Sequence, residues 1–287
     1  MTAQSHALPL AGKSALVTGG AGGIGSASAE ALLRDGCSVV LMGRRRDTLE
    51  QARSRLLPAA NGGARIALSV GDAMQSDDVR HAVALAAEFN GRFDICVSTV
   101  GIGSLTPLIM HDEHSVMQQI ANNVQPTFLA IRHSIPLMAA NGGGSIVCIS
   151  SEAASRPSAW LSIYTTAKAA VEGLVKAAAN ELGRHKIRVN AVRPGPTRTD
   201  ATTDMFLQQN ILDHYFSRAL GRLGEPADIG AAVRYLAGPE SSWVTGESLA
   251  VNGGGDLHFP VDATLWVTGY LGQEVMDKVL AGIDPAA

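Results

Sequence analysis

The stretch SALVTGGAGGIG, which spans residues 14–25, contains the signals that decide the fold. Its first five residues form a short apolar run typical of a buried strand, and the composition of residues 26–34 favours a helix. Glycine is needed between the two because the backbone must turn tightly and let a pyrophosphate approach the N–H groups at the start of the helix. The stretch therefore predicts a strand, a glycine turn and a helix that bind a dinucleotide.

The glycines of this turn fit two spacings. Gly20, Gly22 and Gly25 match Gly-x-Gly-x-x-Gly, and residues 18–25 also match Thr-Gly-x-x-x-Gly-x-Gly. The choice between the two depends on motifs farther along the chain.

Six further apolar runs alternate with helical patterns. The runs are residues 38–42, 65–70, 94–99, 145–150, 187–192 and 248–251. Helical patterns cover residues 76–89, 113–138 and 167–182, and another helix begins at Pro226. This alternation predicts a single α/β domain with a Rossmann-like, doubly wound, seven-stranded parallel sheet flanked by helices.

The composition indicates a globular protein that binds neither nucleic acid nor a membrane. Hydrophobic residues make up 46% of the 287 residues and charged residues 17%, so a large core is expected. A net charge of -3 gives no footprint for nucleic acid, and no apolar run reaches the roughly 18 residues that span a bilayer. Cys37, Cys96 and Cys148 lie in or beside apolar runs, as buried reduced thiols do. Residues 1–13 do not resemble a signal peptide, and we expect a cytoplasmic protein.

Tyr164 and Lys168 lie four residues apart on a predicted helix, and therefore on one face, one turn apart. A free phenol has a pKa of about 10, too high for proton exchange at neutral pH. A phenolate and an ammonium about 4 Å apart attract each other by roughly 4 kcal/mol at an effective dielectric near 20, equivalent to up to about 3 pKa units. The pair predicts a phenol whose pKa is lowered toward neutrality, although a chance pair on a solvated helix face has the same spacing.

Hydroxyl groups are expected beside this helix. The strand at residues 145–150 ends at Ser150 and Ser151, and the carboxyl end of a strand is where open α/β sheets hold ligands. Ser151, Tyr164 and Lys168, with the serine and the tyrosine thirteen positions apart, resemble the catalytic set of the classical short-chain dehydrogenase/reductase family. The resemblance covers about residues 10–255 and favours the second glycine spacing.

The resemblance implies reversible hydride transfer between a nicotinamide cofactor and a secondary alcohol or carbonyl compound. Tyr164 would exchange the proton with the substrate oxygen, Lys168 would lower the pKa of that phenol and bind the nicotinamide ribose, and Ser151 would orient the oxygen. Asn123, with Phe128 five residues on, matches the asparagine that supports a water in the family's proton relay.

The resemblance also implies which residues hold the cofactor. They lie at the glycine turn, after the third and sixth strands and on the catalytic helix: Gly19, Gly23, Ile24, Gly25, Asp72, Ala73, Tyr164, Lys168, Pro194, Gly195, Thr197 and Thr199. Asp72 would bind the adenine amino group, and the backbone at Thr197 and the hydroxyl of Thr199 would bind the carboxamide. The open alternative for Asp72 is that it only caps the next turn.

Residues after the second strand favour NADP(H), with NAD(H) as the second candidate. An NAD enzyme needs an acidic residue there for the ribose hydroxyls, whereas a 2′-phosphate needs an arginine. Gly43 leaves the acidic position empty and Arg44 follows it, so we expect Arg44 to bind the phosphate. The run of three arginines is also typical of a solvated helix start. Gly22 lies where some NADP-using relatives have a second basic residue.

Three alternatives remain to be weighed. His111 and His114 have a spacing that suits a metal, but no cysteine or glutamate completes a ligand set, and we expect no metal site. Residues 98–101 are Ser-Thr-Val-Gly, whereas the family has Asn-Asn-Ala-Gly at this place. The difference changes the side chains available for hydrogen bonds beside the adenine and ribose. A cofactor-binding regulator without chemistry is the alternative of a different class, and the complete set of Asn, Ser, Tyr and Lys argues against it.

The last part of the chain is expected to cover a small-molecule substrate. Residues near 200–220 take the position of the family's variable lid and include apolar Met205, Phe206, Leu207, Ile211, Leu212, Tyr215 and Phe216. An apolar lid favours a substrate with substantial apolar surface. Residues 256–287 extend beyond the cofactor-binding and catalytic domain of residues 1–255, and we expect them to pack over the opening of their own or a neighbouring subunit. The resemblance implies a homotetramer or homodimer, assembled partly through the alanine-rich helix at residues 167–182.

Overall fold

The structure, a computed structural model, describes residues 8–203, 209–257 and 263–285. Within these residues seven strands form one parallel sheet in the order β3-β2-β1-β4-β5-β6-β7. The strands are β1 (Ser14–Thr18), β2 (Ser38–Gly43), β3 (Ile66–Val70), β4 (Ile95–Ser98), β5 (Gly144–Ile149), β6 (Ile187–Pro194) and β7 (Ser248–Val251). The predicted doubly wound parallel sheet is confirmed.

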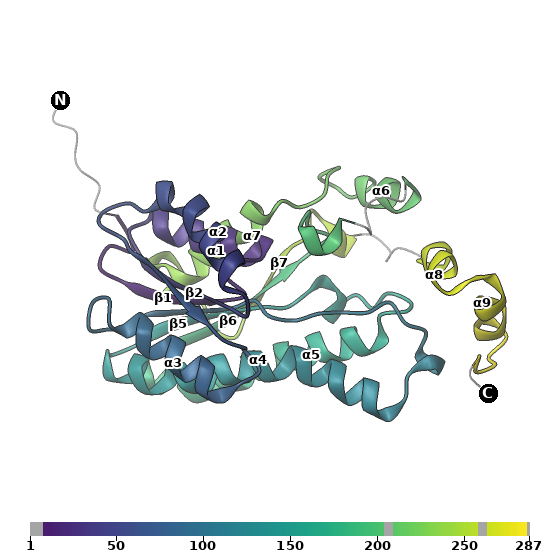
Figure 1. Cartoon of the computed structure of the whole chain (residues 1–287), viewed down its shortest axis with the longest axis horizontal. Coiled ribbons are helices and arrows are strands. Elements are labelled where there is room, and N and C mark those ends of the chain that lie inside the picture. The colour runs from purple at the N-terminus through teal and green to yellow at the C-terminus, as the bar shows by residue number, and fades with distance from the viewer. Residues whose placement is uncertain (1–7, 204–208, 258–262, 286–287) are drawn as a thin grey trace.

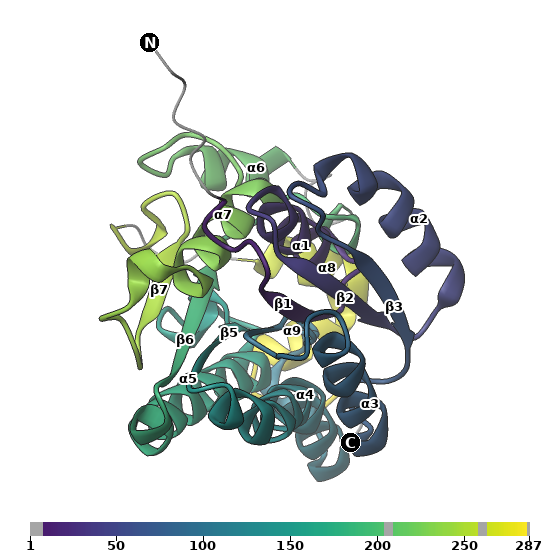
Figure 2. The same cartoon turned by 90° about the vertical axis from the view of Figure 1, so that its left-hand side faces the viewer.

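Helices cover both faces of this sheet (Figure 1, Figure 2). One face is covered by α1 (Gly23–Arg34), α2 (Arg46–Leu56) and α7 (Pro226–Ala237), and the other by α3 (Ser76–Ala87), α4 (Glu113–Ala140) and α5 (Ser162–Leu182). Because both faces are covered, the strands are apolar in continuous runs rather than in alternation, and every residue of β1 is buried.

Two apolar clusters fill the space between the sheet and its helices. Phe93, Leu129 and Val171 belong to the cluster on the side of α3, α4 and α5. Leu49 and Ile229 belong to the cluster on the side of α1, α2 and α7. Together they fix the sheet from both sides, so the loops at its carboxyl edge start from a rigid base.

The strand order reverses between β1 and β4, which pair directly. In an open α/β sheet, ligands bind in the crevice at the carboxyl ends of the strands on either side of such a reversal. The glycine turn leaves the sheet at β1 and the loop that precedes α4 leaves it at β4. The fold therefore places the candidate residues of both segments around one crevice.

Two helices differ from the pattern expected of the sequence. α2 has no counterpart among the predicted helices, because only Leu49, Ala52 and Leu56 of this charged segment reach the core. It begins at Arg46, so the arginine run does lead into a helix. α5 begins at Ser162, five residues before the apolar helical pattern of residues 167–182, and includes Tyr164 as expected. In the described ranges, no helix has the length and apolar character that crossing a membrane requires.

Three short helices gather at one end of the molecule: α6 (Gln209–Phe216), α8 (Thr264–Leu271) and α9 (Gln273–Leu280) (Figure 1). Trp266 of α8 packs on the cluster that Ile211 and Tyr215 of α6 form with Leu223. The expected lid residues Met205, Phe206 and Leu207 lie outside the described residues.

A second small cluster joins the C-terminal helices to the rest of the chain. Val267, Met276 and Val279 form its buried centre, and Leu105 and Trp160 pack against it. Leu105 lies in the loop after β4, and Trp160 lies between Ser151 and α5. The C-terminal segment of this chain therefore contacts loops that border the crevice.

Candidate active site

Tyr164 and Lys168 lie in the first two turns of α5. The Nζ of Lys168 lies 5.7 Å from the centre of the Tyr164 ring and donates a hydrogen bond to the carbonyl of Ile149, at 3.0 Å. Lys168 is only 3% exposed, which is rare for a lysine that has no carboxylate partner. The end of β5 therefore holds this ammonium beside the phenol.

Burial shifts the pKa values of both groups toward their neutral forms. It raises the pKa of Tyr164 above its usual value; hydrogen bonding with Ser151 acts in the opposite direction and the charge of Glu152 adds to the increase. Burial also lowers the pKa of Lys168 to about 8. The direction for Tyr164 is opposite to the one expected from sequence, because desolvation of the phenol is the largest cause and the ammonium of Lys168 is directed at the carbonyl of Ile149.

Asn123 reaches the same place from α4 and is fully buried. Its Nδ2 donates to the carbonyls of Ile102 and Gln119, at 2.7 and 2.9 Å, whereas its Oδ1 has no hydrogen-bond partner among the described residues. A methyl group at Gly101 would lie 2.6 Å from that Oδ1 and 2.7 Å from the Nζ of Lys168. The two side chains thus converge on one point, where glycine is required.

Three features lie near Asn123, Tyr164 and Lys168. Pro126 lies inside α4 and has no N–H, so the carbonyl of Asn122 lacks its usual intrahelical donor. A methyl group at Gly103 would lie 2.7 Å from the Tyr164 ring, so the loop after β4 passes directly over the phenol. Ser151 follows β5, and its Oγ accepts a hydrogen bond from the backbone of Ala153, at 3.2 Å.

The glycine turn is built to bring backbone N–H groups to a ligand. Gly19 has a φ of 65°, and a methyl group there would lie 2.5 Å from the Oγ1 of Thr99. A methyl group at Gly25 would overlap the carbonyl of Gly19. Gly22 caps α1 without a side-chain hydrogen bond, and no acidic residue lies in the first turn. Uncapped donors at a helix N-terminus fit the pyrophosphate of a dinucleotide.

The loop after β6 meets this turn. A methyl group at Gly23 would lie 2.8 Å from the Cγ2 of Thr199, so the two segments are in contact. The hydroxyl of Thr202 donates to the carbonyl of Thr197, at 2.7 Å, and accepts from the N–H of Thr199, at 2.9 Å. Pro194 ends β6 and the N–H of Gly195 donates to β7. The structure thus brings the predicted nicotinamide loop and the predicted phosphate turn together.

The predicted adenosine-side residues lie apart from the catalytic group. Arg44 is exposed directly after β2, and among the described residues it has no ion pair, unlike Arg45 and Arg46. Asp72 accepts a hydrogen bond from the backbone of Met74, at 3.0 Å, so its role as the cap of a turn is observed. Ala73, which follows it, is buried.

The residues that replace the family's Asn-Asn-Ala-Gly supply their own hydrogen bonds. The hydroxyl of Thr99 donates to the carbonyl of Thr18, at 2.6 Å, and the hydroxyl of Ser98 bonds that of Thr127, at 3.3 Å. These contacts tie β4 to β1 and to α4.

Known proteins share this arrangement. A family model described as enoyl-(acyl carrier protein) reductase matches residues 19–256. The A-factor type gamma-butyrolactone 1′-reductase (1S-forming) of Streptomyces virginiae is 36% identical over 244 residues, which are 84% of this chain and 94% of that protein. The structure of a short-chain type dehydrogenase/reductase from Mycobacterium ulcerans matches with a TM-score of 0.89 at 31% identity, and covers 94% of this chain and 99% of that one. The chain belongs to the classical short-chain dehydrogenase/reductase family.

A further solved relative indicates the chemistry of this family. It is a 7α-hydroxysteroid dehydrogenase in complex with NADH and 7-oxo glycochenodeoxycholic acid, with a TM-score of 0.81 at 30% identity, over 88% of this chain and 98% of that one. Short-chain dehydrogenases/reductases are oxidoreductases that bind NAD(P)(H) and act on alcohol or carbonyl groups of small molecules.

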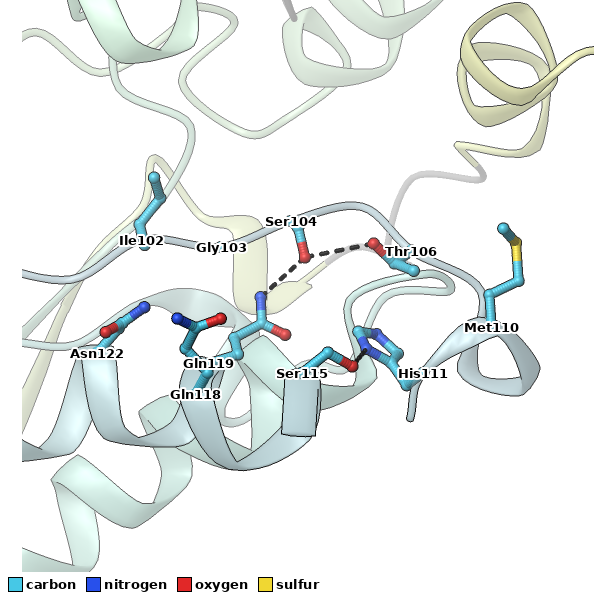
Figure 3. Close-up of a pocket in the computed structure, with 10 residues that line it drawn as sticks. All are labelled: Ile102, Gly103, Ser104, Thr106, Met110, His111, Ser115, Gln118, Gln119 and Asn122. Atoms are coloured by element: carbon cyan, nitrogen blue, oxygen red, sulfur yellow. Dashed lines mark hydrogen bonds between the residues drawn. The ribbon is translucent and has the colours of Figure 1, made fainter. Parts of the chain in front are cut away.

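A cavity of about 310 Å³ lies between the loop after β4 and the start of α4 in this short-chain dehydrogenase/reductase (Figure 3). The loop at residues 102–106 forms one wall and the start of α4 forms the other. The Nε2 of Gln119, on α4, donates a hydrogen bond to the Oγ of Ser104, in the loop, at 3.0 Å. It does not contain the phenol of Tyr164, because the chain at Gly103 lies between them. His111 lines this cavity and its Nδ1 lies 3.3 Å from the Oγ of Ser115. In the part of the chain that the structure describes, no three His, Cys, Asp or Glu side chains group as metal ligands.

Sequence reasoning missed two features of the site. Gly101 and Gly103 are needed because the side chains of Asn123, Lys168 and Tyr164 fill the space beside them. Glu152, the residue after Ser151, forms a partly buried ion pair with Arg218. The glycines are visible in the sequence once the loop is known to cover Tyr164, whereas the ion pair joins residues 66 positions apart and leaves no local signal.

Proposed function

We propose that this protein transfers a hydride reversibly between NADP(H) and a secondary alcohol or carbonyl compound with substantial apolar surface. The observation that carries the proposal is the convergence of Tyr164, Lys168 and Asn123 beneath the loop after β4, with Ser151 beside the phenol. A phenol, an ammonium and a buried amide oxygen without a partner form a path along which a proton can move.

Each side chain has a role that its position supports. Tyr164 exchanges the proton with the substrate oxygen, and Ser151 orients that oxygen through its hydroxyl. Lys168 binds the nicotinamide ribose and assists the phenol. The free Oδ1 of Asn123 holds a water that connects the ammonium to solvent. The cofactor, when bound, supplies or accepts the hydride.

The cofactor proposal depends on both ends of the crevice. The uncapped start of α1 at Gly23, Ile24 and Gly25 holds the pyrophosphate, and Arg44, which is exposed and lacks an ion pair among the described residues, holds the 2′-phosphate of NADP(H). Asp72 serves the adenine while it caps its turn. The loop that includes Gly195, Thr197 and Thr199 holds the nicotinamide.

The substrate proposal depends on the apolar residues around the opening. Leu105 and Trp160 border the catalytic loops and contact the C-terminal helices, and Trp266 contacts the lid. A steroid-sized ketone or alcohol fits such walls, and the solved relative that holds 7-oxo glycochenodeoxycholic acid supports this size class.

The test is turnover of a panel of ketones and secondary alcohols, steroids and aromatic ketones included, followed by nicotinamide absorbance. We expect Tyr164→Phe to lose at least about 100-fold in kcat and to retain cofactor affinity, since it removes only the acid–base group. Tyr270→Phe is the matched control, because Tyr270 is 78% exposed on α8, and it should equal the parent. A Tyr164→Phe variant as fast as the parent on every substrate would refute the catalytic assignment and leave the non-catalytic regulator.

The second candidate is an NAD-dependent alcohol dehydrogenase with the same catalytic group, because the exposed Arg44 is a single cation. Comparison of the affinities for NADP(H) and NAD(H) separates the two. Under our proposal Arg44→Asp weakens NADP(H) binding about tenfold or more, by the loss of one charge-assisted contact to the phosphate. Unchanged affinities in this variant would favour the NAD-dependent reading.

Assembly into a homodimer or homotetramer is part of the proposal. Ala169, Ala170, Gly173 and Ala177 lie exposed on one side of α5, where small residues allow another helix to approach closely. Light scattering of the parent and of Ala170→Arg measures it: the parent should be oligomeric and the variant smaller. A monomeric parent would contradict it.

A further inference from the structure

Arg218 and Glu152 form a partly buried ion pair outside the candidate catalytic group. Arg218 follows α6 and is 8% exposed, and its Nη1 and Nη2 each donate to a different carboxylate oxygen of Glu152, at 2.7 Å. The Glu152 side chain is 20% exposed. Two parallel hydrogen bonds between a guanidinium and a carboxylate fix the orientation of both groups.

The pair is enclosed by four segments of the chain. Nη1 of Arg218 also donates to the carbonyl of Asn252, at 3.0 Å, and a methyl group at Gly195 would lie 3.1 Å from it. A methyl group at Gly255 would overlap both Arg218 and Glu152. The guanidinium therefore joins the lid, the loop after β5, the nicotinamide loop and the turn after β7, and two of these segments have glycine where they meet it.

Glu152 is also the residue after Ser151, so its position and the position of the serine hydroxyl are linked. The charged groups near Tyr164 are the ammonium of Lys168 on its own helix and the carboxylate of Glu152 from the loop after β5. The negative charge of Glu152 raises the pKa of Tyr164. Arg218 is the cation that pairs with this carboxylate.

A second ion pair lies on the other side of Ser151 and is separate. Arg193 donates to Glu172, at 2.7 Å, and Glu172 accepts from the hydroxyl of Ser150, at 2.8 Å. Arg193 and Glu172 are already paired with each other, so Arg193 does not replace Arg218 as the partner of Glu152.

We propose that Arg218 is a positioning residue for the reaction, which holds the Ser151 loop through Glu152 and neutralises that carboxylate beside the phenol of Tyr164. The inference rests on the proposed function, because Arg218 acts only through Tyr164 and Ser151. Under this proposal the lid affects the reaction, because Arg218 belongs to the lid segment and pairs with Glu152.

The pH dependence of kcat/KM for alcohol oxidation separates this role from a purely structural one. Arg218→Met leaves an uncompensated carboxylate near the phenol, so the limb that rises with pH should move to higher pH by about 0.5–1 unit, the lower end of what a nearby like charge produces. Glu152→Gln leaves the guanidinium alone and should move the limb to lower pH. The double variant should return it to the parent position, and Arg218→Lys should keep the position with a lower kcat.

Arg222→Met is the matched control. Arg222 pairs with Asp228 in an exposed bidentate contact near the same lid, and its loss should leave the limb in place. If Arg218→Met does not fold, Glu152→Gln alone tests the proposal, through the direction in which the rising limb of kcat/KM moves with pH.

The outcomes distinguish the two levels of the proposal. A limb that stays in place in Arg218→Met, or in Glu152→Gln if the former is unfolded, overturns the role of Arg218 while Tyr164 remains essential. A parent without turnover, or a Tyr164→Phe variant equal to it, overturns the proposed function and the role of Arg218 with it.

Discussion

The glycine turn and the C-terminal lid, by which we mean α6 together with α8 and α9, both border the proposed site, yet they are held in place by different forces. At the turn, the main chain lies so close to its neighbours that only glycine fits: a side chain at Gly25 would overlap the carbonyl of Gly19, and one at Gly23 would press on the side chain of Thr199. At the lid, small groups of apolar side chains make the contacts, centred on Ile211 in one case and on Met276 in the other. The main-chain geometry of the glycine turn therefore specifies the cofactor side, and sequence motifs reveal that geometry. Side-chain packing specifies the substrate side, and this packing can vary with the substrate.

The largest expected effect comes from placing one methyl group in each region. Gly25→Ala forces the start of α1 away from Gly19, so we expect kcat/KM for the cofactor to fall at least about 100-fold, as for a misplacement of about 1 Å. Gly269→Ala is the matched control on α8, where the added methyl group meets open space, and it should leave kcat/KM unchanged. Equal effects of the two substitutions, measured by cofactor titration and initial rates, would erase the contrast between the regions.

A second prediction concerns the effect of Lys168 on the free energy of unfolding. Burial lowers the pKa of Lys168 to about 8, so its ammonium destabilises the fold at neutral pH. Lys168→Met should raise the free energy of unfolding at neutral pH by about 2 kcal/mol, after allowance for the lost hydrogen bond to Ile149.

The sign of the pH dependence follows from the direction of this shift. The folded-state pKa lies below the unfolded value of 10.5, so between about pH 8 and 10.5 the unfolded chain binds more protons and the stability of the parent rises with pH. Lys168→Met lacks this rise, and its advantage should shrink across that window. Denaturant unfolding at several pH values measures it, and an advantage that grows with pH would refute the assignment.

The smallest expected effect lies in the lid. Trp266→Ala removes the contact of α8 with the cluster around Ile211, and we expect KM for an apolar ketone to rise about tenfold, with kcat and cofactor affinity close to those of the parent. Tyr270→Ala is the control on the same helix, since Tyr270 is exposed, and KM should stay within about twofold. A fall in cofactor affinity in Trp266→Ala would show that the lid also stabilises the cofactor-binding part of the site.

Much of the fold could be predicted because its signals are local. Each buried strand is a short apolar run, and the glycine turn requires glycine for reasons visible within a dozen residues. α2 was missed because few of its residues, Leu49 among them, face the core and the rest are charged or polar. The candidate catalytic residues Ser151, Tyr164 and Lys168 are likewise proposed from a spacing along the chain.

The energetics of the site could not be predicted from the same residues. The direction of the Tyr164 pKa depends on burial by the loop that passes over it at Gly103, which becomes adjacent only in the folded chain. The pairing of Glu152 with Arg218 depends on where the lid returns to the sheet. Local patterns identify the reactive groups, and long-range packing sets their charge states.

The central claim is that the ammonium of Lys168 and the phenol of Tyr164 act as one acid–base unit. The most direct measurement is the pH dependence of hydride transfer in a single turnover of alcohol oxidation at saturating cofactor, for the parent and for Lys168→Met. We predict that the variant is slower at neutral pH and that its controlling ionisation lies higher by about 1 unit or more, since an opposite charge that favours the phenolate has been removed. The same rate and the same ionisation in both proteins would contradict the account.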